Sequence, residues 1–520
     1  DIGLSVTLGH NMRATTQNNL YSEANTLVIP NFYDLSNGSN LITNAEDFGG
    51  RTQAVFAMAD VNYKSLFYLS LTGRLEEDSK LPIDNNQYFF YSASGSFVFS
   101  ELIDNDVLSF GKLRASYGDV GLSAPFFYAT DNYYEAADIT NGWVQPAGVQ
   151  YPLGNGVAGF SYGNILGNPT LRPERQSTFE VGVDARLFND RVGFDISYYS
   201  IQSRDVIIRV PVAPSSGFEF FVDNAASLSN TGIEAIVNVT PVKTNGFRWD
   251  ATFNFTRNRN EVKELAEGVD NVFLGGFTGA STYAVTGQAY STIYGFGFYR
   301  DADGNKVIGS DGFPIIDPTE RAFDSALPDW TLGFRNTFTY KGITLSALLD
   351  IKQGGVVWNG TKGALYFWGT HQETAEMRNT KKTFEGSNAT YNADGSLALD
   401  ANGVPVTSGT NDQEVDIDEY WLAFGNGNGF FGDNTEDFIE DASWVRLREL
   451  SLSYQLPTSI LGNKVKNLSI GFTGRNLFLS TPYTGVDPET NLYGASNAQG
   501  LDYFNMPGTK SYAINLTAKF

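Results

Sequence analysis

The sequence of 520 residues contains no cysteine, which excludes disulfides, thiolate catalysis, Cys-ligated zinc and iron–sulfur clusters. It has only two histidines, His10 and His371, so a metal site built from several histidines is nearly excluded. Basic residues are scarce as well: 35 Lys and Arg stand against 58 Asp and Glu, giving a net charge of −23. That balance argues against a nucleic-acid partner, because nucleic-acid binding needs a basic face.

Long apolar runs are also missing. No segment reaches the roughly 18 apolar residues that a transmembrane helix requires. The first residues lack the basic and apolar regions of a signal peptide and resemble the middle of a strand, which predicts that the chain is the later part of a longer protein. Abundant instead are 54 Gly, 39 Phe and 27 Tyr, in a chain of mean hydropathy −0.22. This composition favours a sheet protein with one apolar face and very polar loops.

Apolar and polar residues alternate with a period of two along many segments, which is typical of β-strands with two different faces. One such segment places Phe179, Val181, Val183, Ala185 and Leu187 on a single face. Segments of this kind predict fourteen strands, at 1–13, 51–62, 65–78, 87–101, 108–119, 171–187, 191–203, 230–241, 247–261, 330–340, 343–352, 442–456, 466–479 and 508–520. The pattern changes phase between Leu447 and Leu450, which predicts a β-bulge.

Short and long connections alternate between these strands. The long, polar ones are 14–50, 120–170, 204–229, 262–329, 353–441 and 480–507. Since alternate connections of an up-and-down meander lie at the same end, all long loops should share one end, as in outer-membrane barrels. A further alternating segment at 290–299 would break this order, so we place it inside a loop.

The polar face of the predicted strands decides their environment. It carries Arg, Asp, Glu, Asn and Gly on nearly every strand, which suits a wet lumen with lipid outside. The sequence therefore predicts an all-β protein, a transmembrane antiparallel up-and-down β-barrel with long extracellular loops. We expect Phe179, Val183 and Leu345 to face lipid and Glu180 and Arg335 to face the lumen. The alternative is a soluble β-repeat protein, against which strand length and loop asymmetry argue.

Several motifs of the C-terminal two thirds resemble one known family. The segments 437–454, 474–477 and 483–489 are similar to the late-strand signatures of SusC/RagA-type TonB-dependent transporters of Bacteroidetes outer membranes. The segments 168–174 and 224–234 resemble the mid-barrel motifs of the same family, and Pro328-Asp329-Trp330 and Gln353-Gly354-Gly355 are similar to it too. These matches keep family order over 165–520.

The resemblance implies a barrel of 22 strands, the size of plugged outer-membrane transporters. Residues 1–520 would then be its C-terminal part, without the plug domain, the first strands and the segment that contacts TonB. It implies import of large nutrients, with glycans or oligosaccharides first and peptides next, under a SusD-like lipoprotein lid. Two other classes stay open: a self-contained passive or adhesive barrel, and a secreted β-rich glycan hydrolase.

Chemistry-bearing motifs are few, and we expect no enzymatic activity. The segment 159–163 matches the G-x-S-x-G nucleophile elbow but lies in a Gly-rich loop without the required surroundings. The oxygens of Asp301, Asp303, Asn305 and Asp311 could form a loose cage for Ca²⁺, although the spacing is not that of an EF-hand.

Aromatic residues of the long loops are the candidate ligand- or partner-binding residues, because their rings can stack on sugars or anchor a protein. They are Tyr133, Tyr134, Trp143, Trp368, Trp421, Phe430 and Phe431. Packing within the loops is the alternative role.

Overall fold

The computed structural model describes residues 2–103, 105–125, 127, 129–136, 138–140, 148–151, 156–422, 434–457 and 465–520. Fourteen strands pair in sequence order into one antiparallel sheet, and the short β10 (Ile165–Leu166) pairs in parallel with β13. The fourteen are β1 (Ile2–Leu27), β2 (Gly38–Tyr63), β3 (Phe67–Asp78), β4 (Gln87–Phe97), β5 (Leu108–Leu122), β11 (Glu174–Leu187), β12 (Val192–Pro211), β13 (Phe220–Lys243), β14 (Phe247–Glu264), β20 (Trp330–Tyr340), β21 (Ile343–Gln353), β28 (Trp444–Gln455), β29 (Asn467–Ser480) and β31 (Ser511–Lys519).

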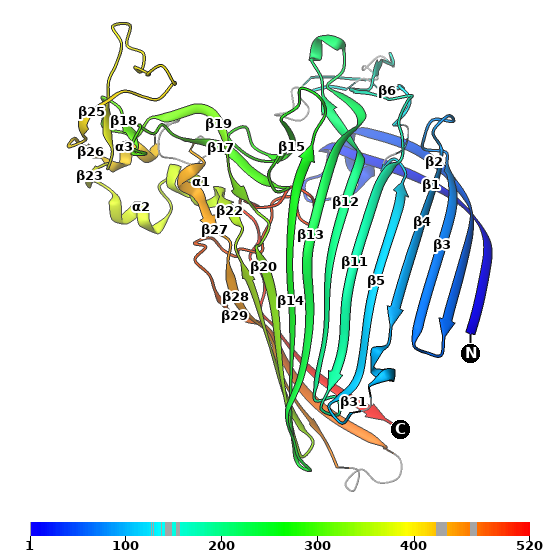
Figure 1. The fold of residues 1–520 in the computed structure, drawn as a ribbon. Coiled ribbons are helices and arrows are strands. Elements are labelled where there is room, and N and C mark those ends of the chain that lie inside the picture. Colours follow the sequence, from blue (N-terminus) through cyan, green and yellow to red (C-terminus); the bar gives the residue numbers. More distant parts are fainter. Residues whose placement is uncertain are drawn as a thin grey trace.

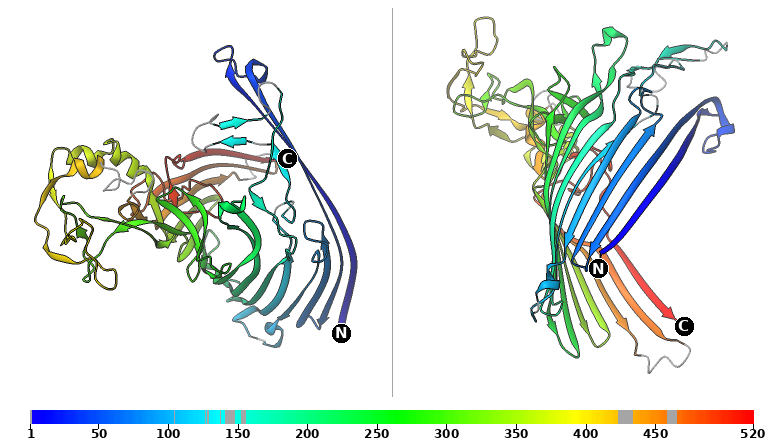
Figure 2. Two further views of the ribbon diagram at one scale, coloured as in Figure 1. Left: turned by 90° about the horizontal axis from the view of Figure 1, so that it is seen from above. Right: turned by 45° about the vertical axis from the view of Figure 1, so that its right-hand side comes forward.

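The sheet curls into an open arc, seen from above in Figure 2, with the two ends of the chain on its edge strands. Among the described residues β1 pairs only with β2, and β31 pairs only with β29. Within the described residues, strand 1–13 thus does not pair with 508–520. Helices are short and few; among the described residues none combines the length and the hydrophobicity that crossing a bilayer requires.

The register confirms that each strand has two different faces. Phe179 is paired with Tyr117 of β5 on one face, which we call the outer face. On the opposite face, which we call the lumenal face, Arg114 forms ion pairs with Glu180 and Asp195. Phe179 and Leu345 are 44% and 38% exposed, although they are large and apolar, as expected for groups that meet lipid rather than a protein core.

The predicted bulge is present in β28. The pairing with β21 shifts between Leu349, opposite Leu447, and Leu348, opposite Glu449. The pairing with β29 shifts at the same place, between Leu447 and Glu449. The extra residue, Arg448, explains why the apolar pattern of the sequence changes phase there.

Connections at the two ends of the sheet differ as predicted. At one end β20 and β21 are joined by Lys341 and Gly342 alone, both with positive φ, the backbone of a two-residue hairpin turn. Two of the expected long loops are wrong in extent: 14–50 and 204–229 mostly continue the hairpins β1–β2 and β12–β13, leaving 28–37 and 212–219 as connections. The extension of β1–β2 is polar on both faces, and that of β12–β13 has apolar residues on both faces, such as Ile207 and Ile208, so neither extension alternates.

Three of the remaining long connections, 262–329, 353–441 and 480–507, fold into a lobe at one end of the sheet (Figure 1). Its strands are β15 (Asn271–Gly276), β16 (Ala280–Val285), β17 (Thr292–Phe298), β18 (Val307–Ile308), β19 (Ile316–Ser325), β22 (Val356–Asn359), β23 (Lys381–Thr383), β24 (Ser387–Ala389), β25 (Thr407–Thr410), β26 (Glu414–Asp416), β27 (Ile439–Asp441) and β30 (Leu501–Asp502), and its helices are α1 (Gly360–Phe367), α2 (Gln372–Met377) and α3 (Ile417–Leu422). The segment 290–299 forms β17 but pairs with β16 and β19, so it lies outside the large sheet as expected.

Four shorter strands lie in the connection between β5 and β11. They are β6 (Tyr134–Ala136), β7 (Asp138–Thr140), β8 (Gly148–Gln150) and β9 (Phe160–Tyr162). β6 pairs with β9, and β7 pairs with β8. None of these four strands therefore pairs with a strand of the lobe.

Candidate functional site

The lumenal face carries a continuous set of charge-assisted hydrogen bonds. Arg114 donates to Asp195 through two nitrogens, at 2.6 and 3.1 Å, and also to Ser197. Farther along the sheet, Arg335 contacts Glu449 at 3.2 Å, and Glu449 also pairs with Arg475. Fixed charges of both signs along one face suit a wet passage, because polar solutes can exchange hydrogen bonds with it.

Small hydroxyl side chains make part of this face hollow. A concavity of about 340 Å³ lies over β3, β4 and β5, where Ser70, Ser94, Ser96 and Ser116 contribute small side chains. Lys112, Arg114 and Glu180 border it. The wall therefore offers hydrogen bonds without filling the lumen.

Three long loops interlock in the core of the lobe. Trp358 has no exposed surface and packs with Ile293 of 262–329 and Leu501 of 480–507. β22, which contains Trp358, pairs with β27 on one side and with β30 on the other. Segments far apart in the sequence thus form one folded body rather than separate loops.

Buried polar contacts hold loop 480–507 in place. Arg446 of β28 is bonded to Asp487 at 2.7 Å, with side chains only 5% and 8% exposed. Tyr483 donates to Asp502 at 2.6 Å. Burial raises the pKa of Asp502, and burial together with the hydrogen bond to Asp502 raises the pKa of Tyr483, so the tyrosine stays a neutral donor.

The structure separates the predicted aromatic residues by environment. Trp368 follows α1 and is 64% exposed. Tyr133, just before β6, is 52% exposed, and Tyr134, its first residue, is 62% exposed. Tyr134 stacks on Tyr162 of β9, with ring centroids 4.2 Å apart. Trp421 of α3 instead packs edge-on against Tyr366 at 4.5 Å, inside the lobe. Trp143, Phe430 and Phe431 lie outside the described residues. Ligand or partner binding by these residues stays a prediction.

The predicted calcium cage is a hydrogen-bonded turn. Asp301 accepts from the backbone N–H groups of Asp303 and Asn305 and from the hydroxyl of Ser387. These hydrogen bonds, the one from Ser387 most of all, stabilise the carboxylate and hold the pKa of Asp301 below its usual range. Asp311 accepts from a backbone N–H of its own turn. Among the described residues no cluster of three acidic or histidine side chains could hold a metal ion, and calcium binding stays untested.

This turn belongs to a duplicated unit that sequence reasoning missed. Residues 301–315 and 392–406 share the pattern of a D-G turn followed by a G-x-P turn, and seven backbone hydrogen bonds made by the first copy recur in the second. The first copy is buried: Ile308 has no exposed surface and Phe313 stacks on Tyr420 at 5.8 Å. The second copy projects, and Leu399, the counterpart of Ile308, is 48% exposed.

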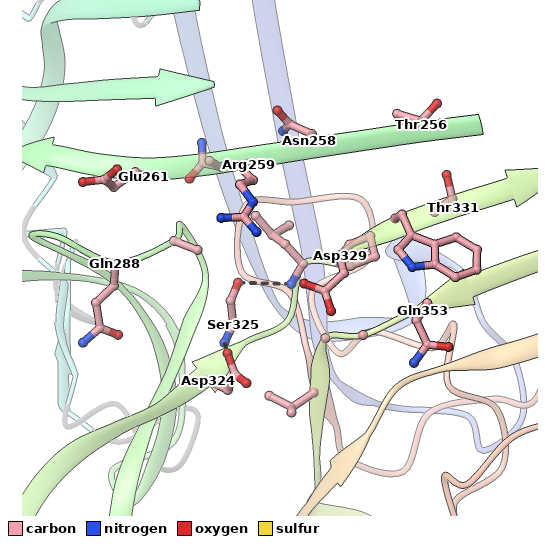
Figure 3. A pocket seen from close by; sticks show the side chains of 18 of the residues that line it. Thr256, Asn258, Arg259, Glu261, Gln288, Asp324, Ser325, Asp329, Thr331 and Gln353 are labelled. Carbon is pink, nitrogen blue, oxygen red and sulfur yellow. Dashed lines mark hydrogen bonds between the residues drawn. The ribbon is translucent and has the colours of Figure 1, made fainter. Parts of the chain in front are cut away.

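A large cavity lies where β14 separates from β20. Its volume is about 1030 Å³. Figure 3 shows Arg259 pointing from β14 toward Ser325 and Asp329, with Thr256 and Asn258 on the other side of the strand; Glu261 also lines the cavity. Sequence reasoning did not find this site, because its walls come from segments as far apart in the sequence as Ser229 and Asp441.

The fold recurs in known proteins. The model of the family "TonB dependent receptor-like, beta-barrel" matches residues 1–477. The chain belongs to this family. Members of the family are β-barrel proteins of the outer membrane, so the outer face described above meets lipid and the lobe stands at one membrane surface.

Relatives of this TonB-dependent receptor barrel are similar over about half their own length. "TonB-dependent receptor P26" of Formosa agariphila is 25% identical over 94% of this chain and 48% of its own. "TonB-dependent receptor SusC" of Bacteroides thetaiotaomicron is 23% identical over 91% of this chain and 44% of its own. The resemblance to the SusC/RagA type is thus confirmed.

Solved structures share the fold of the barrel. The RagAB peptide importer in its closed-closed state matches with a TM-score of 0.71 at 21% identity, covering 99% of this chain and 53% of that one. Its open-open state matches with the same TM-score of 0.71 and covers 100% of this chain. The likeness therefore extends through the lobe as well as the sheet.

Proposed function

We propose that the protein imports nutrients too large for porins across the outer membrane, with energy from TonB acting through a segment upstream of this sequence. The lumenal face supports this, because its charged and hydroxyl groups can exchange hydrogen bonds with a polar cargo. Glycans are the first candidate cargo and peptides the second. The names SusC and RagAB peptide importer among similar proteins support these two classes. The chemistry is binding and gating, without bond cleavage.

We further propose that a SusD-like lipoprotein covers the lobe. The observation that carries this proposal is the interlocking of three loops around Trp358, which gives a preformed surface with exposed aromatic residues. A preformed surface loses little conformational entropy when a partner binds. Trp368 projects from it, and exposed tryptophans are frequent anchors of protein interfaces.

Pull-down of the tagged protein from native membranes in mild detergent tests the lid. We expect a surface lipoprotein in about one-to-one amount, and we expect Trp368→Ala to lower its recovery severalfold. Phe478→Ala is the matched control, because Phe478 is 59% exposed but lies on the outer face of β29. Recovery of the barrel without any stoichiometric lipoprotein would contradict the proposal.

Growth on defined carbon sources tests import itself. A strain lacking the protein should lose growth on one class of large glycan or peptide, and deletion of TonB should give the same loss. Uptake that persists without TonB would favour the passive barrel instead.

A further inference from the structure

One edge of β14 has no strand beside it where the strand borders the cavity. β14 pairs with β20 only up to Thr256, which lies opposite Thr331, the second residue of β20. On its other side β14 stays paired with β13 as far as Glu264. Within the described part of the chain, residues 257–261 therefore pair with β13 alone.

This unpaired stretch is bounded at both ends. Before Trp330 the chain turns away, because Pro328 has no N–H and the N–H of Asp329 donates to the carbonyl of Gln353 at 2.9 Å. At the far end, Val262 donates to the carbonyl of Gln288 and accepts from the N–H of Gly287, both at 2.8 Å. The stretch between is five residues, or about 17 Å at about 3.3 Å per residue.

Asn258 and Asn260 direct their main-chain groups toward the unpaired side. In a strand, the N–H and C=O groups of successive residues point to opposite sides, and those of Val262 point away from β13. The register with β13 runs from Val262 to Ala251 without a shift, so Asn260 and Asn258 share the direction of Val262. Their N–H and C=O groups have no partner on that side among the described residues. Such an edge is a template for another strand.

The cavity lies beside this edge. It is lined by Thr256 and Asn258, from the lumenal face of β14, and by Arg259 and Glu261, from its outer face (Figure 3). Side chains of both faces line the same cavity because the cavity adjoins the strand along its edge. Its volume of about 1030 Å³ is at the upper end of the roughly 300–1,000 Å³ that is usual for ligand pockets.

Carboxylates outnumber cations in the lining. The charged lining residues are Arg259 and the five acidic residues Glu261, Asp324, Asp329, Glu440 and Asp441. Glu261 is paired with Lys263 at 2.6 Å, and Glu440 with Lys362 at 3.6 Å. The remaining excess of negative charge favours a ligand that carries a basic group.

We propose that an extended peptide binds in this cavity by adding a strand to the edge of β14 at Asn258 and Asn260, with a basic side chain beside the carboxylates. A polypeptide backbone supplies donors and acceptors at the spacing of the edge, whereas the hydroxyl groups of a sugar chain do not repeat at that spacing. Since the main chain carries the affinity, many sequences could bind. This inference rests on the proposed import function and names peptides as the cargo class at this site.

Fluorescence anisotropy of the full-length transporter in detergent tests strand addition. The probe is a labelled, capped pentapeptide of alternating threonine and lysine. We expect it to bind, and we expect the same peptide with every backbone nitrogen methylated to bind more than tenfold more weakly, because it has no N–H to donate. Absence of binding, or equal binding of the methylated peptide, would overturn the proposal.

Asn258→Pro removes one N–H of the edge. That N–H takes no part in the pairing with β13, and proline is tolerated at such edge positions. Asn258→Ala is the matched control, because both variants lose the amide that donates to Asn230 at 3.1 Å, but alanine keeps the N–H. We expect Asn258→Pro to weaken binding about fivefold, the effect of one hydrogen bond, and Asn258→Ala to change it little. Equal effects would contradict strand addition.

Asp329→Asn tests the charge of the cavity. It should weaken binding of the lysine peptide severalfold and leave binding of a peptide with glutamine in place of lysine unchanged; an equal loss for both would overturn the basic side chain. Competition by maltoheptaose at comparable concentration would show a sugar site and overturn the peptide assignment. Growth that depends on TonB but no peptide binding would overturn this inference and leave import standing. Peptide binding as expected without such growth would support the edge site and contradict import.

Discussion

Arg446→Ala is expected to release loop 480–507 from the lobe while the sheet remains folded. Asp487 is 6% exposed and would be left as a buried carboxylate without its bonded cation. Removing one partner of a buried ion pair costs about 3–5 kcal/mol. Exchange of backbone amide hydrogens should therefore become faster throughout 480–507, including β30, but not in β20 or β21.

The matched control for this prediction is Arg475→Ala. Arg475 also pairs with a carboxylate, that of Glu449, but its side chain is 63% exposed. Exposed ion pairs are worth about 0–1 kcal/mol, so little change in exchange is expected. Arg446→Met combined with Asp487→Leu should recover much of the lost protection, because no charge is then buried. Unchanged exchange in Arg446→Ala would show that the loop is held by its apolar contacts alone.

Leu345→Arg is expected to destabilise the barrel in the membrane, by at most about 2–4 kcal/mol, because that is the cost of an arginine at the bilayer midplane and the cost falls toward the interfaces. Leu345 is opposite Phe338 on the outer face, in the third residue pair from the turn between β20 and β21. An arginine there must stay in hydrocarbon or pull headgroups inward. The measurement is the denaturant midpoint of the barrel refolded in lipid vesicles.

Thr344→Arg provides the comparison within the same strand. Thr344 is paired with Thr339, one residue away and on the lumenal face, where water and other charges are present. We expect a change much smaller than for Leu345→Arg. Equal effects of the two substitutions would contradict the assignment of faces.

Alternation predicted the sheet because it reports burial on only one side of each strand. It located the fourteen strands, and its phase change at Leu447 located the bulge. It failed for 14–27 and 38–50, where β1 and β2 continue beyond the bilayer. Thr16 and Gln17 can both face water there, so a strand and a loop have the same composition.

The site could be predicted only in part, because its contacts depend on the tertiary fold. Trp368 and Trp421 both lie in the long polar connection 353–441, so the sequence does not distinguish their roles. In the structure Trp421 of α3 packs against Tyr366, whereas Trp368 follows the end of α1 and is exposed. The sequence suggested Asp301 as a metal ligand, but in the structure its carboxylate accepts hydrogen bonds from backbone N–H groups of its own turn. The cavity at Arg259 needs the separation of β14 from β20, which no local pattern encodes.

The duplicated turns suggest how such a surface can diversify. The backbone hydrogen bonds that shape the copy at 392–406 close largely within it and with its neighbour Thr390, so the segment folds by local rules. A unit of this kind can be copied, lengthened or exchanged without rebuilding the hydrophobic core below it. The projecting copy is therefore a natural place for related proteins to vary what they show to the outside, and a practical place to insert an epitope tag in a living cell.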